Sequence, residues 1–515
     1  MTRAFPFLLA LLVTAPLAAQ TAMSEWSTSD RTIIGDFTRI TSVAAARDRV
    51  YATSPSAVLM WNPWFRRWEG TAVPPDPAML DRVFASLVDP LDNTLWLARI
   101  DGWVHYDPFI QLWETGVVNG PVQEIAFDLA APFNGLHLRT PSGWVMIPRG
   151  TNAAVPGLAP AQPVQPASVR QAIQANPTLQ ANSAAILLDN RLRSARYTSA
   201  ARSFEGLGWY LGTWGVGLLY IPDGAALPDQ LTYGLPGEEV DALYSAPNGV
   251  WVTTARSPST DPGIAFVASE LNDFRWFRGP TAIGLPFGRS SEIVARRRDL
   301  WIGTDAGVAA VDVESGEVTL YDEGHGLPDN RVLSVATRQG RLVFGTARGV
   351  AVLDSGEVRR VAPGFVDPAL ALALTGDTIW VGTRRGILTI LPGEDDAVVM
   401  PELQSAASLR LGASAFAWQA DTLVAMSEDR LLWRKPETGT WFLGPLLSPL
   451  LGQLRAMTAD QEGLWIAGDR GLAHTTATMA PSRILDIPLD TNGEVRALAA
   501  DEVYLWVGTE NGLTR

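Results

Sequence analysis

The sequence contains no cysteine among its 515 residues. This absence excludes disulfide bonds, thiol catalysis and thiolate metal sites, and it also excludes the lipidated cysteine that tethers bacterial lipoproteins. Histidine is scarce as well, and the four residues of this type are His105, His137, His325 and His474. None of the four has a second histidine or a carboxylate at the spacing of a helical metal site. We therefore expect no metal site and no cofactor.

Basic residues are in deficit, because 40 lysine and arginine residues stand against 54 aspartate and glutamate residues, which gives a formal net charge of −14. Phosphate binding depends on a basic surface, so the composition argues against a nucleic-acid partner. The small basic cluster Arg296-Arg297-Arg298 is followed directly by the acidic residue Asp299. We interpret it as a solvated hairpin tip.

Long hydrophobic runs are missing except at the N-terminus. Residues 1–20 combine a basic Arg3, an apolar stretch and the small residues Ala18-Ala19 before Gln20. This layout is that of a cleaved signal peptide. No later run approaches the roughly 20 apolar residues that a membrane helix requires. We therefore expect a mature protein without a transmembrane segment, located in the periplasm or secreted.

A short motif recurs along the chain, and its clearest copy is Leu300-Trp301-Ile302-Gly303-Thr304 followed by Gly307. Aligning the copies on their aromatic position gives eleven units, at Tyr51, Trp96, His137, Tyr210, Trp251, Trp301, Val343, Trp380, Leu423, Trp465 and Trp506. Most neighbouring positions lie 41 to 45 residues apart, which is the length of a four-stranded propeller blade. Helical patterning is nearly absent, so the sequence predicts an all-β propeller protein.

Each unit is predicted to consist of short strands separated by turns. Around Val343, we expect an outer strand over 316–321, a turn at 326–328, an inner strand over 331–336 and the next strand over 341–345. The glycine two residues after the aromatic position predicts a close approach of neighbouring blades, where a side chain would collide. The glycine six residues after it predicts a tight hairpin with a positive φ angle.

The repeat resembles a known family, the two-component regulator propeller repeat. The residues that match its pattern are Gly303-Thr304, Tyr321-Asp322, Gly326-Leu327-Pro328, Asn330 and Val332, with further turn matches at Gly234-Leu235-Pro236 and Gly284-Leu285-Pro286. In that family the repeats usually form the periplasmic sensor half of a membrane histidine kinase. No kinase half follows the repeats in this sequence, so the resemblance implies a stand-alone exported propeller. The chain also looks like the propeller component of a bacterial secretion apparatus.

Eleven units exceed the four to eight blades of familiar rings, so we predict two propellers, one interrupted by the other, with a single oversized ring as the alternative. The expected organisation is a first set of blades over 24–148, an Ala/Pro-rich insertion over 149–185 and the remaining blades over 186–515. The insertion either contains one short helix over 167–175 or hides a degenerate blade. The last unit lacks an outer strand, and residues 24–34 are predicted to supply it and close the ring.

Nineteen tryptophans fall into two groups. Six recur at the repeat position and are expected to be core residues: Trp96, Trp251, Trp301, Trp380, Trp465 and Trp506. Seven others that fall outside this register are candidate binding residues: Trp61, Trp64, Trp68, Trp103, Trp113, Trp214 and Trp276.

We therefore expect a non-enzymatic exported propeller that acts as a binding or assembly platform for a protein or polysaccharide partner in the bacterial envelope. One alternative is a soluble ligand-sensing propeller that signals through a separate membrane partner. The other is a propeller lyase or glycan-active enzyme, for which His137 and His325 are the candidate catalytic residues.

Overall fold

The computed structural model describes most of the chain. The described residues are 32–187, 194–255, 262–277, 285–391, 395–396, 398–399, 412–475, 481–485 and 493–515. The predicted signal peptide, the first part of the predicted closing segment (residues 24–31) and Gly284 lie outside the described residues. Short helices are α1 (Val169–Ala175), α2 (Pro177–Ile186) and α4 (Ser448–Leu451).

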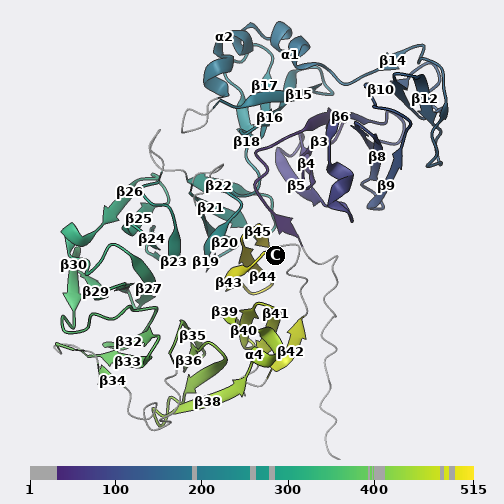
Figure 1. The fold of residues 1–515 in the computed structure, drawn as a ribbon. Coiled ribbons are helices and arrows are strands. Elements are labelled where there is room, and N and C mark those ends of the chain that lie inside the picture. The colour runs from purple at the N-terminus through teal and green to yellow at the C-terminus, as the bar shows by residue number, and fades with distance from the viewer. Residues whose placement is uncertain are drawn as a thin grey trace, which may run out of the picture.

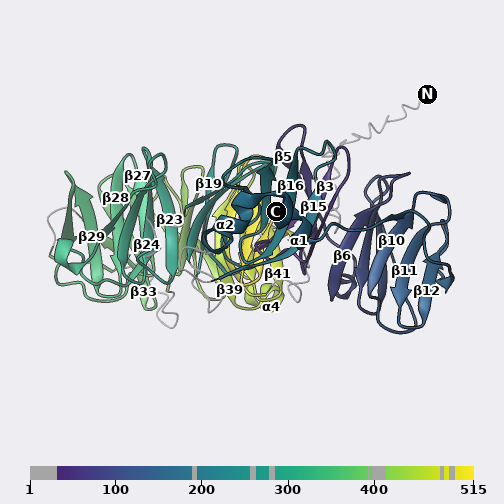
Figure 2. The ribbon, with the colours of Figure 1, turned by 90° about the horizontal axis from the view of Figure 1, so that it is seen from above.

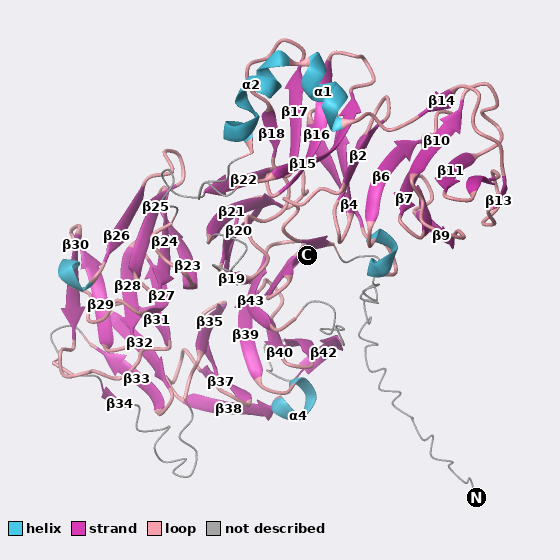
Figure 3. Ribbon diagram, turned by 45° about the horizontal axis from the view of Figure 1, so that its top comes forward, coloured by secondary structure: helices cyan, strands magenta, loops and turns pink. Residues whose placement is uncertain are grey.

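The described residues form eleven antiparallel sheets, ten with four strands and one with five, as predicted for an all-β propeller protein (Figures 1 and 3). Seven of them form a ring, whose strands are β19–β22 (Val240–Ala246, Gly249–Thr254, Gly263–Ala268, Phe274–Phe277), β23–β26 (Ser290–Arg296, Asp299–Thr304, Gly307–Asp312, Val318–Tyr321), β27–β30 (Val332–Arg338, Arg341–Thr346, Gly349–Asp354, Glu357–Val361), β31–β34 (Ala371–Thr375, Thr378–Thr383, Gly386–Ile390, Val398–Val399), β35–β38 (Ala415–Gln419, Thr422–Met426, Arg430–Arg434, Trp441–Leu446), β39–β42 (Leu454–Ala459, Leu464–Gly468, Gly471–Thr475, Pro481–Leu485) and β43–β45 (Val495–Ala500, Leu505–Thr509, Gly512–Thr514).

The ring closes on itself. Its innermost strands contact one another in the order β19, β23, β27, β31, β35, β39 and β43, and β43 in turn contacts β19 (Figure 1). The last sheet is completed by β1 (Ile33–Ile34), which pairs antiparallel with β45 so that Ile33 faces Thr514 and Ile34 faces Leu513. The prediction that an N-terminal strand completes the last blade is therefore confirmed at these two residues.

The other four sheets form an arc, inserted into the chain between β1 and β19. Its strands are β2–β5 (Ser42–Ala45, Val50–Thr53, Val58–Asn62, Arg67–Ala72), β6–β9 (Val83–Val88, Leu95–Arg99, Gly102–Asp107, Leu112–Val117), β10–β14 (Glu124–Asp128, Leu136–Thr140, Gly143–Ile147, Val155–Pro156, Pro163–Val164) and β15–β18 (Arg196–Arg202, Gly208–Trp214, Leu218–Pro222, Asp229–Leu231). Contacts between innermost strands run from β15 to β2, β6 and β10. One set of blades thus interrupts the other, as predicted, but it forms an open arc instead of a second complete ring (Figure 1).

The Ala/Pro-rich insertion covers both ends of the arc. At one end, Ala172 of α1 and Leu179 of α2 are fully buried in a cluster with Trp209 of β16, and Figure 3 shows both helices beside β15–β17. At the other end, β14 pairs with β10, and Asp128 accepts hydrogen bonds from the backbone N–H groups of Ala161 and Gln162, both at 2.9 Å. Repeat arrays need such caps because a terminal repeat has no neighbour to bury its outer face. The predicted short helix is confirmed, and it begins at Val169 because Ser168 forms its capping box.

The repeat glycines have the predicted roles. A Cβ atom at Gly303 would lie 2.8 Å from Val332 Cγ1 of the next blade, and one at Gly508 would lie 2.5 Å from Val240 Cγ1 across the closure. A side chain at either position would force the blades apart. Gly307, six residues after the aromatic position, has a φ of 131°, which side chains disfavour.

The six tryptophans at the repeat position are all buried, as predicted. Two of them donate their indole N–H to a carboxylate five residues earlier: Trp465 to Asp460 at 2.7 Å and Trp506 to Asp501 at 3.0 Å. This arrangement satisfies the one polar atom of a side chain that is otherwise surrounded by apolar atoms.

Ring and arc share one continuous hydrophobic core, which includes Trp68, Tyr233, Phe274 and Trp506. The Tyr233 ring lies 4.8 Å from the Trp68 ring of the arc and 4.4 Å from the Phe274 ring of the β19–β22 blade, measured between centroids. The Trp68 indole N–H also donates to the Thr232 carbonyl at 2.8 Å. Aromatic contacts and a partly buried hydrogen bond therefore hold the two modules together.

Glu292 connects two neighbouring innermost strands of the ring. Its Oε2 atom accepts a hydrogen bond from the backbone N–H of Val335 at 2.8 Å. Desolvation of the carboxylate between the blades raises the pKa of Glu292 to about 7, although the residue as a whole is exposed.

We expect stability to fall as the pH rises from about 4.3, the ordinary pKa of glutamate, to about 7, because the folded protein binds the Glu292 proton more tightly than the unfolded chain does. Glu292→Gln should raise the melting temperature above pH 7 and leave it unchanged at pH 4. The gain should be modest, since Glu292 is exposed and solvent screens its charge. Thermal unfolding of both proteins from pH 4 to 8 measures the difference, and a gain at pH 4 would contradict the assignment.

Candidate functional site

One face of the arc carries an unusual set of apolar side chains. Because antiparallel strands alternate in direction, the first and third turns of each blade lie on the same face, called the turn face below (Figure 2 shows the blades edge-on). On the turn face of the arc, ten large hydrophobic side chains are exposed: Trp64, Phe65, Leu91, Phe109, Ile110, Leu129, Phe133, Phe204, Leu207 and Leu227. In the described part of the ring, Leu391 and Val503 are the only large hydrophobic side chains exposed on the corresponding turns.

The arc and the ring use the same turn with different chemistry. In the arc, Asp107 Oδ1 accepts hydrogen bonds from the backbone N–H groups of Phe109 and Ile110, at 2.9 and 3.4 Å. In the ring, Asp312 Oδ1 holds Glu314 and Ser315 in the same way, both at 2.8 Å. The turn geometry is therefore conferred by the aspartate, and the apolar tips are not needed for folding.

A pocket of about 330 Å³ opens on this face, between the β2–β5 blade and the β15–β18 blade. We call it the interblade pocket. Its aromatic lining consists of Trp61, Trp64, Phe204, Tyr210 and Tyr220, and its charged lining consists of Arg47, Arg66, Glu205 and Asp229. The chain separation between its two walls exceeds one hundred residues, so only folding brings them together.

The interblade pocket is held in shape by its own contacts. The Trp64 indole N–H donates to the Arg47 carbonyl at 2.9 Å, which fixes the indole across the neighbouring turn although 57% of the residue is exposed. The rings of Tyr210 and Tyr220 lie 4.7 Å apart. Burial and the neighbouring Tyr220 raise the pKa of Tyr210 to about 12, so its hydroxyl is neutral at physiological pH.

The polar groups of the interblade pocket can offer both donors and acceptors. Arg66 and Asp229 are 3.7 Å apart and largely exposed, so their ion pair is weak and either group can turn to a ligand. Aromatic walls with a few polar groups of both signs are typical of binding sites that stack on a ligand and orient it by hydrogen bonds.

The seven tryptophans predicted to bind a partner occupy different environments. Trp61, Trp68 and Trp103 are buried, with at most 9% of each exposed, and Trp113 and Trp276 are half-buried. Trp64 and Trp214 are exposed, and Trp214 has the guanidinium groups of Arg39 and Arg196 over its ring. Only Trp61 and Trp64 meet in the interblade pocket, and a binding role for any of the seven stays a prediction.

Sequence reasoning missed Phe204, Tyr210 and Tyr220. Tyr210 stands at the repeat position, and only 4% of its surface is exposed. Phe204 occupies a turn tip that has no counterpart in the motif, so no sequence signal pointed to it.

The two histidines of the enzyme alternative are not brought together. His137 is buried in the arc, where its Nδ1 lies 3.2 Å from the Leu158 carbonyl oxygen. His325 lies in the ring on an exposed turn, where its Nδ1 is 2.8 Å from Asp322 Oδ1. Within the described residues, no group of three or more histidine or acidic side chains could hold a metal ion.

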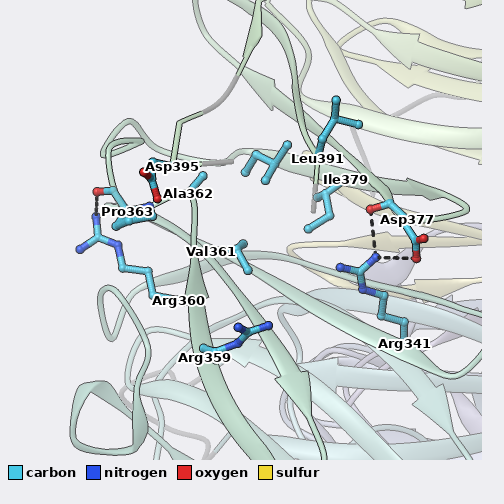
Figure 4. Close-up of a pocket in the computed structure, with 11 residues that line it drawn as sticks. Arg341, Arg359, Arg360, Val361, Ala362, Pro363, Asp377, Ile379, Leu391 and Asp395 are labelled. Atoms are coloured by element: carbon cyan, nitrogen blue, oxygen red, sulfur yellow. Dashed lines mark hydrogen bonds and ion pairs between the residues drawn. The ribbon is translucent and has the colours of Figure 1, made fainter. Parts of the chain in front are cut away.

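In two pockets of the ring, polar groups of the lining already form hydrogen bonds within the protein. In a pocket of about 260 Å³, Arg341 donates to the Asp377 carbonyl at 3.0 Å, and Arg360 donates to the Pro363 carbonyl at 3.0 Å (Figure 4). In a wider pocket of about 970 Å³, the half-buried carboxylates of Asp460 and Asp501 already accept the indole N–H groups described above. In the part of the chain that the structure describes, no helix is both long and apolar enough to cross a membrane.

Comparisons with known proteins find solved structures of low similarity. No family model and no curated protein matches it. The extracellular domain of the hybrid two-component system BT4673 from B. thetaiotaomicron aligns with 13% identity and a TM-score of 0.42, over 92% of this chain and 70% of that one. PorZ, a surface component of the type-IX secretion system of Porphyromonas gingivalis, aligns with 12% identity and a TM-score of 0.42, over 92% and 68%.

An inactive variant of virginiamycin B lyase from Staphylococcus aureus aligns with 12% identity and a TM-score of 0.42, over 54% of this chain and 94% of that one. Similarity at this level carries no argument about function. The fold therefore rests on the strand pairing described above, and the function is argued from the site.

Proposed function

We propose that the protein is a non-enzymatic, exported β-propeller that serves as a binding platform for a protein or polysaccharide partner in the bacterial envelope. The interblade pocket is the recognition site, and the observation that carries the proposal is its lining. Five aromatic side chains and charges of both signs converge there on one face of the arc. Aromatic residues in a preformed pocket are the side chains that most often anchor a partner.

Further contacts support binding rather than catalysis. The Ser203 hydroxyl of the interblade pocket accepts hydrogen bonds from the backbone N–H groups of Leu207 and Gly208, at 3.0 and 3.1 Å. The hydroxyl therefore stabilises the turn. An activated nucleophile would instead be hydrogen-bonded to a general base.

A soluble sensor is the second candidate. The volume of about 330 Å³ would admit a small ligand as well as one group of a larger partner, because small-molecule sites begin at roughly this size. A signal would then pass to a separate membrane partner. Recovery of a macromolecule by the tagged protein distinguishes the platform from the sensor.

Replacing Trp64 and Phe204 together by alanine should reduce partner recovery from envelope extracts at least about tenfold, because aromatic anchors commonly contribute ~2 kcal/mol or more each. The melting temperature should hardly change, since both side chains are more than half exposed. Recovery is measured by affinity capture with the full-length protein, followed by protein and sugar analysis. The control is Glu314→Ala with Ser315→Ala, on the matching turn of the ring. Equal recovery by the two variants would contradict the site.

A further inference from the structure

The arc and the ring differ in charge as well as in apolar exposure. Residues 32–231 contain 14 arginines against 16 acidic residues, whereas residues 232–515 contain 24 basic against 36 acidic residues. The acidic charge of the protein therefore lies almost entirely in the ring module, and the arc is close to neutral.

Charges near the turn face of the arc are largely paired with one another. Arg49 contacts Glu69 at 2.9 Å, and Arg149 contacts Asp89 at 2.6 Å. A third pair joins Arg202 and Asp223 at 2.5 Å. The turn face therefore presents neutralised ion pairs between its apolar tips, and it has no basic excess that would attract an anionic partner.

The apolar tips are distributed over all four blades of the arc. The most exposed are Phe65, Phe109, Ile110 and Phe133, each with 67 to 77% of its surface exposed. A folded protein partner would need a matching hollow opposite every tip. A lipid bilayer accepts aromatic and aliphatic side chains between its headgroups at any position in its plane, with polar groups remaining at the headgroup level.

We propose that the turn face of the arc docks on the interface of a zwitterionic lipid bilayer, with the apolar turn tips inserted between the headgroups. Neutral paired charges match zwitterionic headgroups, while the acidic ring would be repelled by an anionic surface. This inference goes beyond the proposed function, and the two can fail separately. Because the interblade pocket opens on the same face, a partner bound there would be held at the membrane surface.

The test uses the full-length protein and sedimentation with vesicles of phosphatidylcholine. The unaltered protein should bind, and Phe109→Ser with Ile110→Ser should reduce the partition coefficient about tenfold or more, because two inserted apolar side chains are lost. Glu314→Ala with Ser315→Ala, on the matching turn of the ring, should bind vesicles like the unaltered protein. Replacing a third of the lipid by phosphatidylglycerol should not strengthen binding.

A second measurement does not depend on the stability of the serine variant. The chain has no cysteine, so Ile110→Cys and Ser315→Cys can each be labelled at one position with a polarity-sensitive fluorophore. Vesicles should shift the emission of the label at position 110 to the blue and leave the label at position 315 unchanged. The proposal would be overturned if the label at position 110 showed no shift, or if the protein bound only anionic vesicles. It would also be overturned if the unaltered protein bound no vesicles while the serine variant lost partner capture.

Discussion

Replacing Ile34 by alanine should lower the free energy of unfolding by about 2–5 kcal/mol, the range for buried isoleucine. Ile34 is fully buried in the core that ring and arc share, and it pairs with Leu513 to complete the last blade. Its truncation leaves a cavity at the closure of the ring. Because closure also hides an open strand edge, the variant should aggregate more readily. Denaturant unfolding and light scattering measure both effects.

Ile33 provides the matched control for Ile34. It belongs to the same strand but is only half-buried, so Ile33→Ala should cost much less. An independent test replaces Ile33 and Thr514, which face each other across β1 and β45, by cysteine. Directly opposed residues of an antiparallel pair lie within disulfide reach, and no other cysteine competes. Closure by β1 would be refuted if the two cysteines did not crosslink within one chain and both alanine variants lost the same small amount of stability.

Trp68→Ala should cost about 3–5 kcal/mol of stability, whereas Trp64→Ala, four residues earlier, should change it by less than about 0.5 kcal/mol. Trp68 is 4% exposed and donates a hydrogen bond to Thr232 at the junction of the two modules. Trp64 is 57% exposed. Denaturant unfolding of both variants measures the contrast. Similar losses for the two tryptophans would contradict the burial of Trp68, and the pair also separates a folding role from a binding role within one hairpin.

The blade itself could be predicted from the sequence because its requirements are local. Gly303 is needed where the next blade comes within 2.8 Å of its missing Cβ atom, and Gly307 is needed where φ is positive. Both glycines recur in the repeats that match the motif closely, so they produce a periodic pattern in the sequence. The missing outer strand of the last unit also pointed to closure, since a propeller blade with three strands leaves an open edge.

Exposure of individual tryptophans could not be predicted in the same way. Trp64 and Trp68 both fall outside the repeat register, yet one lies on a turn tip and the other packs against Tyr233, which is distant in sequence. A residue outside the register can face either solvent or a neighbouring module, and the local pattern is the same in both cases.

The sequence by itself determined the all-β repeat architecture, the buried tryptophans of the repeat position, the short helix of the insertion and the strand that completes the last blade. Only the tertiary structure decided that seven blades close into a ring while four remain an open arc, and that Trp64 meets Phe204 in a pocket. The reason is physical: strand and turn formation depend on neighbouring residues, whereas the number of blades that close depends on packing between units far apart in the chain.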